Sequence, residues 1–349
     1  MRQFLLLAFI ILCFTGVVQA NPLRDQQLAA RHINNFHFTG YTVGSYNYLT
    51  QSNKFYSGIY NRIYDLEPNG FTLQQINATF FKKPKEGLGG LLSLVAGRDA
   101  NQIALKGFNS NIFGIQNFGF TVAQAYLYYH YQSNVLKIGE MLSLAGIEVY
   151  DYTQVSNFSR SIISDYAQPG TYLGVRYIHR LNPYLAIIAG AGNGWNTIEK
   201  PLQLDNIELG LSIKFGDKFS FMLDGYNVAQ GLTDDSTTKP ITRRNFIDLY
   251  GTYYINQKLN LAFNYDYGYQ PKVALPSDQI GVAKWQGLAG YINYEWAERW
   301  KTSLRAEIFD DVNGYRTGIR QNWREVTLTI TYIPVKKFEV TAETRHDFF

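Results

Sequence analysis

Three consecutive runs at the C-terminal end alternate between apolar and polar residues, and this alternation constrains the fold more than any other feature. In the first run, Leu304 and Ile308 share one face, whereas Arg305 and Glu307 share the other. Successive strand residues point to opposite sides, so each run is a strand with an apolar and a polar face. A soluble sandwich would bury the apolar faces between two sheets. A membrane barrel would turn them to lipid and line a wet lumen with the charges.

The connections between such runs distinguish these two architectures. Fifteen runs follow residue 20, at about 36–49, 71–81, 88–97, 119–131, 135–144, 171–180, 184–195, 207–215, 219–228, 245–255, 259–269, 285–296, 302–311, 324–334 and 338–349. Short connections alternate with longer polar ones near 50–70, 98–118, 145–168, 196–205, 231–243, 271–283 and 312–321. Outer-membrane barrels have short periplasmic turns and long extracellular loops. The pattern therefore predicts an all-β transmembrane antiparallel barrel; the faces of the apolar run 184–195 stay unassigned.

The N-terminus predicts export. Residues 1–20 have the charged start, apolar run and small-residue cleavage site of a signal peptide, with cleavage expected before Asn21, although a retained anchor is the alternative. The only cysteine, Cys13, lies in this segment, so the mature chain has no disulfide. We expect one barrel domain over residues 21–349, with a polar lead at 21–35. Aromatic residues, 16% of the chain, suit girdles at the two bilayer interfaces. Without a basic cluster, nucleic acid is not expected as a partner.

Eight stretches carry a resemblance to a known family: AQAYLYY (123–129), LKIGEMLSLAGIE (136–148), NFSRS (157–161), PGTYLGVRY (169–177), NGWN (193–196), LRAEIFDD (304–311), REVTLTITYIP (324–334) and ETRHD (343–347). In this order they resemble the OmpL-like outer-membrane barrels, the β-barrel porin-2 family. The resemblance covers most of the chain after the signal peptide. It implies a barrel of about 16 strands that forms a diffusion channel in the outer membrane of a Gram-negative bacterium.

The strand number departs from this pattern. Fifteen runs are countable, whereas single-chain bacterial barrels have an even number of strands. Three explanations would each resolve the difference: a strand missing from the sequence, a further strand hidden in residues 23–35, or a parallel closure of the two ends. The first is favoured. Phe348 and Phe349 resemble the terminal aromatic that the barrel-assembly machinery recognises. On the strand count, however, this strand runs outward, so its end would face the wrong side of the membrane for that recognition.

The polar faces supply the candidate pore-lining residues. A barrel of about 16 strands is too wide for side chains to fill, and such a channel selects solutes by size and lumen charge. The constriction and lining candidates are Glu148, Arg160, Arg176, Arg305, Glu307, Glu325, Glu343 and Arg345, and further inward charges are Arg180, Asp224, Asp248, Asp266 and Asp347. These charges either create a transverse field or neutralise one another between strands.

The segment 145–168 is long and polar, and we expect it to fold into the lumen with Glu148 and Arg160 at the constriction. The alternative is an ordinary surface loop.

The sequence favours a porin for passive diffusion of small hydrophilic solutes and ions, without enzymatic activity. The alternative is a non-conducting barrel that acts as a surface receptor or adhesin. An enzyme would have to start from His130 near Ser133, or from His179 near the 145–168 segment, and neither has a recognisable third partner. No cofactor is expected, and the histidine spacing predicts no metal site. Expected partners are outer-membrane lipid, the barrel-assembly machinery and small hydrophilic solutes; a homo-oligomer is left open.

Overall fold

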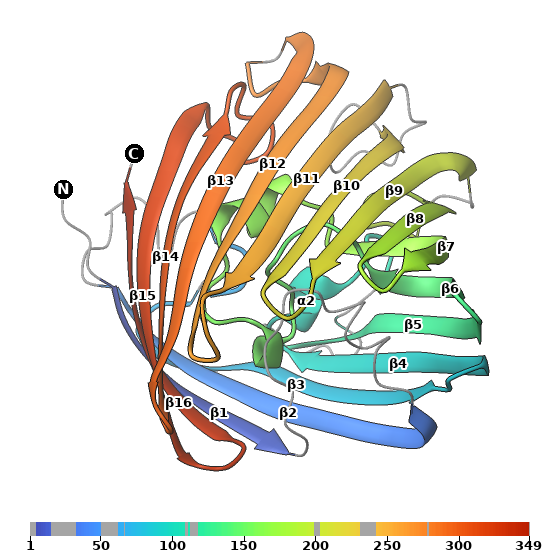
Figure 1. The fold of residues 1–349 in the computed structure, drawn as a ribbon. Coiled ribbons are helices and arrows are strands. Elements are labelled where there is room, and N and C mark those ends of the chain that lie inside the picture. Colours follow the sequence, from blue (N-terminus) through green and yellow to red (C-terminus); the bar gives the residue numbers. More distant parts are fainter. Residues whose placement is uncertain are drawn as a thin grey trace.

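A computed structural model describes residues 5–14, 33–49, 62–65, 67–108, 111, 118–198, 203–230, 242–277 and 279–348. Within them one antiparallel sheet closes into a barrel (Figure 1). Its strands are β1 (Leu5–Phe14), β2 (Ile33–Leu49), β3 (Gly70–Lys83), β4 (Gly87–Gly97), β5 (Gly119–Tyr131), β6 (Asn134–Leu142), β7 (Thr171–Asn182), β8 (Leu185–Gly192), β9 (Gln203–Phe215), β10 (Phe219–Gln230), β11 (Thr242–Tyr254), β12 (Leu259–Ala274), β13 (Ile280–Ala297), β14 (Trp300–Asp311), β15 (Gln321–Val335) and β16 (Phe338–Phe348). The helices are α2 (Ala100–Ile103), η1 (Tyr152–Gln154) and η2 (Ile163–Ala167).

Strands β2–β16 correspond one to one to the fifteen predicted runs, so that prediction is confirmed. Tight turns of two to four residues join alternate strands at one end of the barrel, the turn end, and longer connections lie at the other, the loop end. One predicted loop, 271–283, is wrong in extent. After a bulge, β12 and β13 keep pairing at Val273–Gly281 and Ala274–Ile280, which leaves a connection of only 275–279.

The barrel is closed by β1, which none of the three expected closures anticipated. Leu5–Leu12 pairs antiparallel with β16, and Leu5–Phe14 pairs antiparallel with β2. This strand is the apolar run of the predicted signal peptide. A hidden strand was considered in residues 23–35; of these, 33–35 belong to β2 and 23–32 lie outside the described residues.

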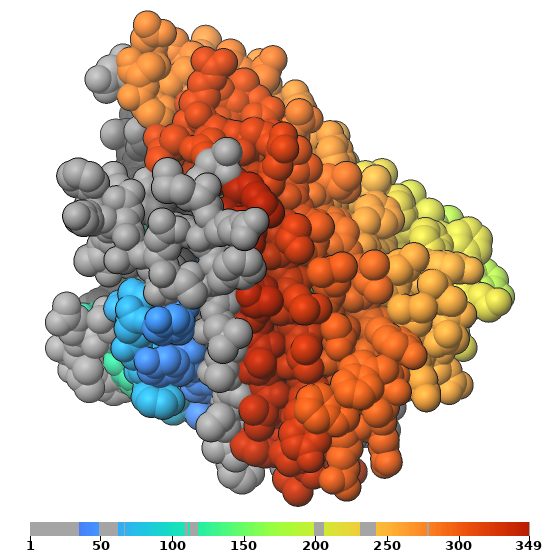
Figure 2. Space-filling model, turned by 90° about the vertical axis from the view of Figure 1, so that its left-hand side faces the viewer, coloured from blue at the N-terminus to red at the C-terminus, as the bar shows by residue number. Residues whose placement is uncertain are grey.

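The two faces of the sheet are inverted relative to a soluble protein. On β14, Leu304 and Ile308 are 38% and 39% exposed, whereas Arg305 between them is fully buried. The same alternation runs along β13, β15 and β16, whose outer surfaces form the continuous wall in Figure 2. Apolar side chains gain from leaving water, so an apolar outer face indicates a lipid-facing wall. The apolar run of β8 resolves in the same way, because Ile187 is exposed and Ile188 buried.

Aromatic rings gather near both ends of the outer wall. At the turn end, Trp300 stacks between Trp296 and Tyr332 at centroid distances of 5.4 and 4.5 Å. At the loop end, Tyr46 and Phe71 lie 4.9 Å apart. Rings at both ends are typical of the two girdles of an outer-membrane barrel, as the composition predicted. Among the helices in the described part of the chain, none is long and apolar enough to cross a membrane.

Candidate constriction site

The connection between β6 and β7, Ser143–Gly170, folds into the barrel and is called the inward segment below. It is the green coil within the ring of strands in Figure 1. The predicted fold of residues 145–168 into the lumen is therefore what the structure shows, and the surface-loop alternative is wrong. The segment has two short helices, η1 and η2, and the wall must satisfy most of its remaining backbone N–H groups.

Carboxylates of the wall hold the backbone of the inward segment. Glu343 on β16 accepts hydrogen bonds from the N–H groups of Phe158 and Ser159 at 2.7 and 3.0 Å. Glu307 on β14 accepts from Ile162 and Ile163 at 2.6 and 3.1 Å. A carboxylate has two acceptor oxygens, so each of these acids can hold two successive N–H groups. Both predicted lining residues thus bind the segment.

Arg305 connects the wall to the inward segment in this network. Its guanidinium donates to Glu325 at 2.6 Å, to Glu148 at 2.8 Å and to the carbonyl of Ser159 at 2.7 Å. The side chains of Arg305, Glu325 and Glu148 are all buried. Arg345 on β16 lies 3.4 Å from the same Glu325. Among the predicted lining charges on β14–β16, Arg305 and Arg345 therefore pair with Glu325, whereas Glu307 and Glu343 bind backbone N–H groups of the inward segment.

Glu148 and Arg160 both lie in the lumen, but they fold the inward segment onto itself. Glu148 accepts the N–H of Ser161 at 2.7 Å. Arg160 donates to the carbonyls of Phe158 and Tyr150 at 2.9 and 3.1 Å. Only 2% of Arg160 is exposed, so its guanidinium is packed inside the segment and does not face open space.

A second ion pair holds the start of the segment, and sequence analysis found only half of it. Arg176 on β7 donates to both oxygens of Glu208 on β9, at 2.6 and 2.7 Å. Glu208 also accepts from the hydroxyl of Tyr226, which in turn accepts the N–H of Leu144 at 2.7 Å. Glu208 was not a candidate. Its place on the polar face of its run was the available signal, but the run did not show which cation it would meet.

Asp224, Asp248 and Asp266 face one another on β10, β11 and β12, in direct cross-strand register. Asp248 accepts the N–H of Gly146 at 3.0 Å, and Gln168 donates to Asp266 at 2.8 Å, so the inward segment covers this ladder too. Across the described residues, no group of three or more His, Cys, Asp or Glu has metal-binding geometry.

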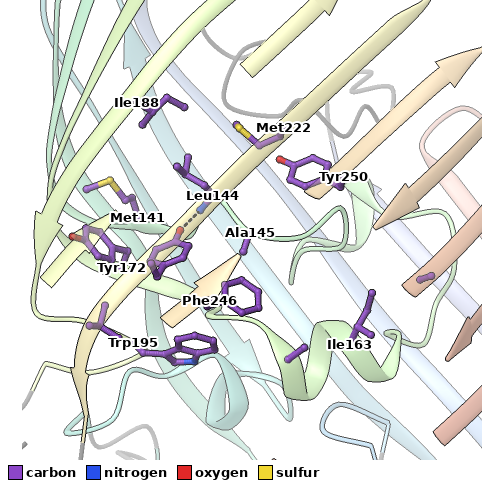
Figure 3. Packing of buried hydrophobic residues seen from close by; sticks show 14 of the residues in the cluster. Met141, Leu144, Ala145, Ile163, Tyr172, Ile188, Trp195, Met222, Phe246 and Tyr250 are labelled. Carbon is purple, nitrogen blue, oxygen red and sulfur yellow. Dashed lines mark hydrogen bonds between the residues drawn. The ribbon is translucent and has the colours of Figure 1, made fainter. Parts of the chain in front are cut away.

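The apolar side of the segment fits notches in the wall. Leu144, Ala145 and Ile163 point toward the wall side chains in Figure 3. A Cβ on Gly287 of β13 would overlap Cγ2 of Ile163, and one on Gly210 of β9 would lie 2.8 Å from Cδ1 of Leu144. A close fit of this kind stabilises one docked position. The lumen therefore contains an apolar core, which the alternating pattern of a porin wall alone does not predict.

Two carboxyl groups couple docking of the inward segment to pH. Burial, followed by the neighbouring Asp65, raises the pKa of Asp165 in η2 to about 7; Arg345 and Glu148 also face it. Burial likewise raises the pKa of Asp99, which precedes α2, to about 7 despite the hydroxyl that Tyr152 donates to it at 2.9 Å. The docked position of the inward segment is therefore more stable when these two carboxyl groups are neutral.

We therefore expect docking to weaken as pH rises from about 4 through 7, the window between the ordinary and the raised pKa. Glu148 acts oppositely: burial raises its pKa, but Arg305 and Arg160 outweigh that effect and lower it, so its contribution is lost only below its ordinary pKa near 4.5.

Single-channel currents at pH 5 and pH 8 should show several-fold more large openings at pH 8. The double variant Asp99→Asn/Asp165→Asn should flatten this difference, whereas Asp310→Asn, on the outer face of β14, should not. An unchanged pH profile in the double variant would refute the assignment.

A closed antiparallel barrel with an apolar outer wall, two aromatic girdles and a loop folded into a charged lumen defines an outer-membrane porin. The family model "Putative beta-barrel porin-2, OmpL-like" matches residues 35–348, and the chain belongs to this family. The resemblance noted from the eight sequence stretches is thereby confirmed.

Solved structures show the same fold at low identity. The outer membrane channel DcaP of Acinetobacter baumannii is 11% identical, with a TM-score of 0.52 over 99% of this chain and 96% of that one. An anion-selective porin from Comamonas acidovorans is 11% identical, with a TM-score of 0.50 over 99% and 98% of the two chains. At this identity the likeness is one of fold alone. Among curated proteins, no match is found.

Proposed function

We propose that this porin passes small hydrophilic solutes and ions by passive diffusion, and that the inward segment limits the width of the path. The observation that carries the proposal is the anchoring of successive backbone N–H groups by Glu343 and Glu307. A loop held at both ends and along its length by buried wall charges keeps a defined position in the bore. The turn end then faces the periplasm and the loop end faces outward.

In this proposal the eight predicted lining residues act mainly by positioning the inward segment. All of them are buried. Seven contact the inward segment or one another, and Arg176 pairs with Glu208, which reaches the start of the segment through the hydroxyl of Tyr226. We further propose that the chain has no enzymatic activity. His179 lies on the outer face, hydrogen-bonded to Asn134 at 2.8 Å, and so it points away from the inward segment.

We also propose that residues 1–20 are removed during export to the outer membrane. Removal would vacate the position of β1 and leave β2 and β16 facing each other across a gap one strand wide. Unpaired strand edges are costly in lipid, so another strand pairing is required there. Outer-membrane lipid, the barrel-assembly machinery and further copies of the chain are the partners that this proposal implies.

Single-channel recording of Arg160→Ala tests the proposal. Loss of the guanidinium leaves the carbonyls of Phe158 and Tyr150 without their donor inside the segment, so we expect larger and noisier current steps. The intact mass of the same preparation reports whether residues 1–20 were removed. Wild-type steps from folded Arg160→Ala would remove Arg160 from the constriction. A silent bilayer with folded wild type would favour the receptor function instead.

A further inference from the structure

The inward-facing charges are not distributed evenly around the turn-end half of the lumen. Four cations occupy inward positions close to the turns on one arc of the wall, β3–β9, and are called the basic arc: Lys83, Lys137, Arg180 and Lys214. Lys83 is the last residue of β3, and Lys214 is the last but one of β9.

Two members of the basic arc, Arg180 and Lys214, leave positive charge beside the bore. Lys137 lies 5.0 Å from the ring of Tyr126, another inward residue. Arg180 pairs in register with the buried Ala186, and Lys214 with the buried Ser220, which places both cations on the inner face. Arg180 and Lys214 are only partly buried, and within the described residues neither forms an ion pair.

Four acids of the opposite wall, β10–β16, do not offset these cations, because they are already engaged. Glu307, Glu343 and Asp248 hold N–H groups of the inward segment, and Glu325 is bound by Arg305. Nearer the turns the opposite wall presents neutral hydroxyls, namely Ser220, Thr252, Thr331 and Thr341. Its charged pair there, Lys301 and Glu339, lies at 3.6 Å. The field in this half of the lumen is therefore set mainly by Arg180 and Lys214 of the basic arc.

We propose that small anions are the preferred solutes of this porin and that Arg180 and Lys214 determine that preference. A low-dielectric cavity lined by one sign of charge concentrates the opposite ion by about 10-fold or more. This inference rests on the proposed channel function and names its solute class.

The test is the reversal potential of the channel across a potassium chloride gradient, at about 0.1 M salt so that screening is moderate. Wild type should pass chloride over potassium with a permeability ratio of about 10. The double variant Arg180→Glu/Lys214→Glu should bring the ratio to 1 or below, and Arg180→Gln/Lys214→Gln should give an intermediate value. Lys284→Glu, which changes an exposed cation on the outer face of β13, should keep the wild-type ratio.

The outcomes separate the two proposals. Wild-type current without anion preference, or a ratio unchanged by charge reversal in folded variants, overturns the anion assignment and leaves the channel in place. Absence of current from folded wild type overturns the channel function itself. If charge reversal prevents folding, the glutamine variant, which adds no charge, must still lower the ratio.

Discussion

A Gly287→Val variant should open to a larger conductance far more often than wild type. The new side chain would occupy the space of Ile163, and Phe309 lies within 3.1 Å of the same position, so the wall cannot yield easily. Overpacking of this kind typically costs about 1–3 kcal/mol, which raises the undocked population of the inward segment roughly 5- to 150-fold. The measurement is the histogram of single-channel currents from folded protein.

Gly290→Val is the matched control for this variant. Gly290 lies three residues further along the same strand, is exposed on the outer face, and has no atom within 4 Å of an added Cβ. It should keep wild-type currents. Identical histograms for the Gly287 and Gly290 variants would show that the notch does not hold the segment.

Arg305→Ala should destabilise the barrel more than any other single replacement of a lumen charge. It leaves Glu148 and Glu325 buried together without the cation that binds both. Removing one partner from a buried ion pair costs about 3–5 kcal/mol. We expect a clear fall in the urea midpoint of unfolding and in the temperature at which folded gel mobility is lost.

Arg324→Ala serves as the control, because Arg324 is exposed on the outer face of β15 and its guanidinium donates to Asn322. Its loss should change stability by about 0.5 kcal/mol or less. Adding Glu325→Gln to Arg305→Ala should recover part of the stability, since one uncompensated charge is then removed. Equal midpoints for the two arginine variants would contradict the role of Arg305.

The alternation of apolar and polar residues predicted a large part of the architecture. The alternation around Arg305 placed Leu304 and Ile308 outside and Arg305 and Glu307 inside, and the structure has them so. The length of residues 145–168 between two short runs also indicated a segment that could reach into the lumen. Where the sequence did not alternate between apolar and polar residues, as in the apolar run of β8, the two faces became clear only from the register with the neighbouring strands.

The sequence by itself determined which residues form strands and which faces meet lipid, because both depend on a period of two that needs no distant contact. Only the tertiary structure decided what the inner charges do. Arg305 meets Glu148 across 157 positions, and Gly287 receives Ile163 from another part of the chain. Such partners depend on strand register, barrel closure and the path of the inward segment, none of which is encoded within a single run.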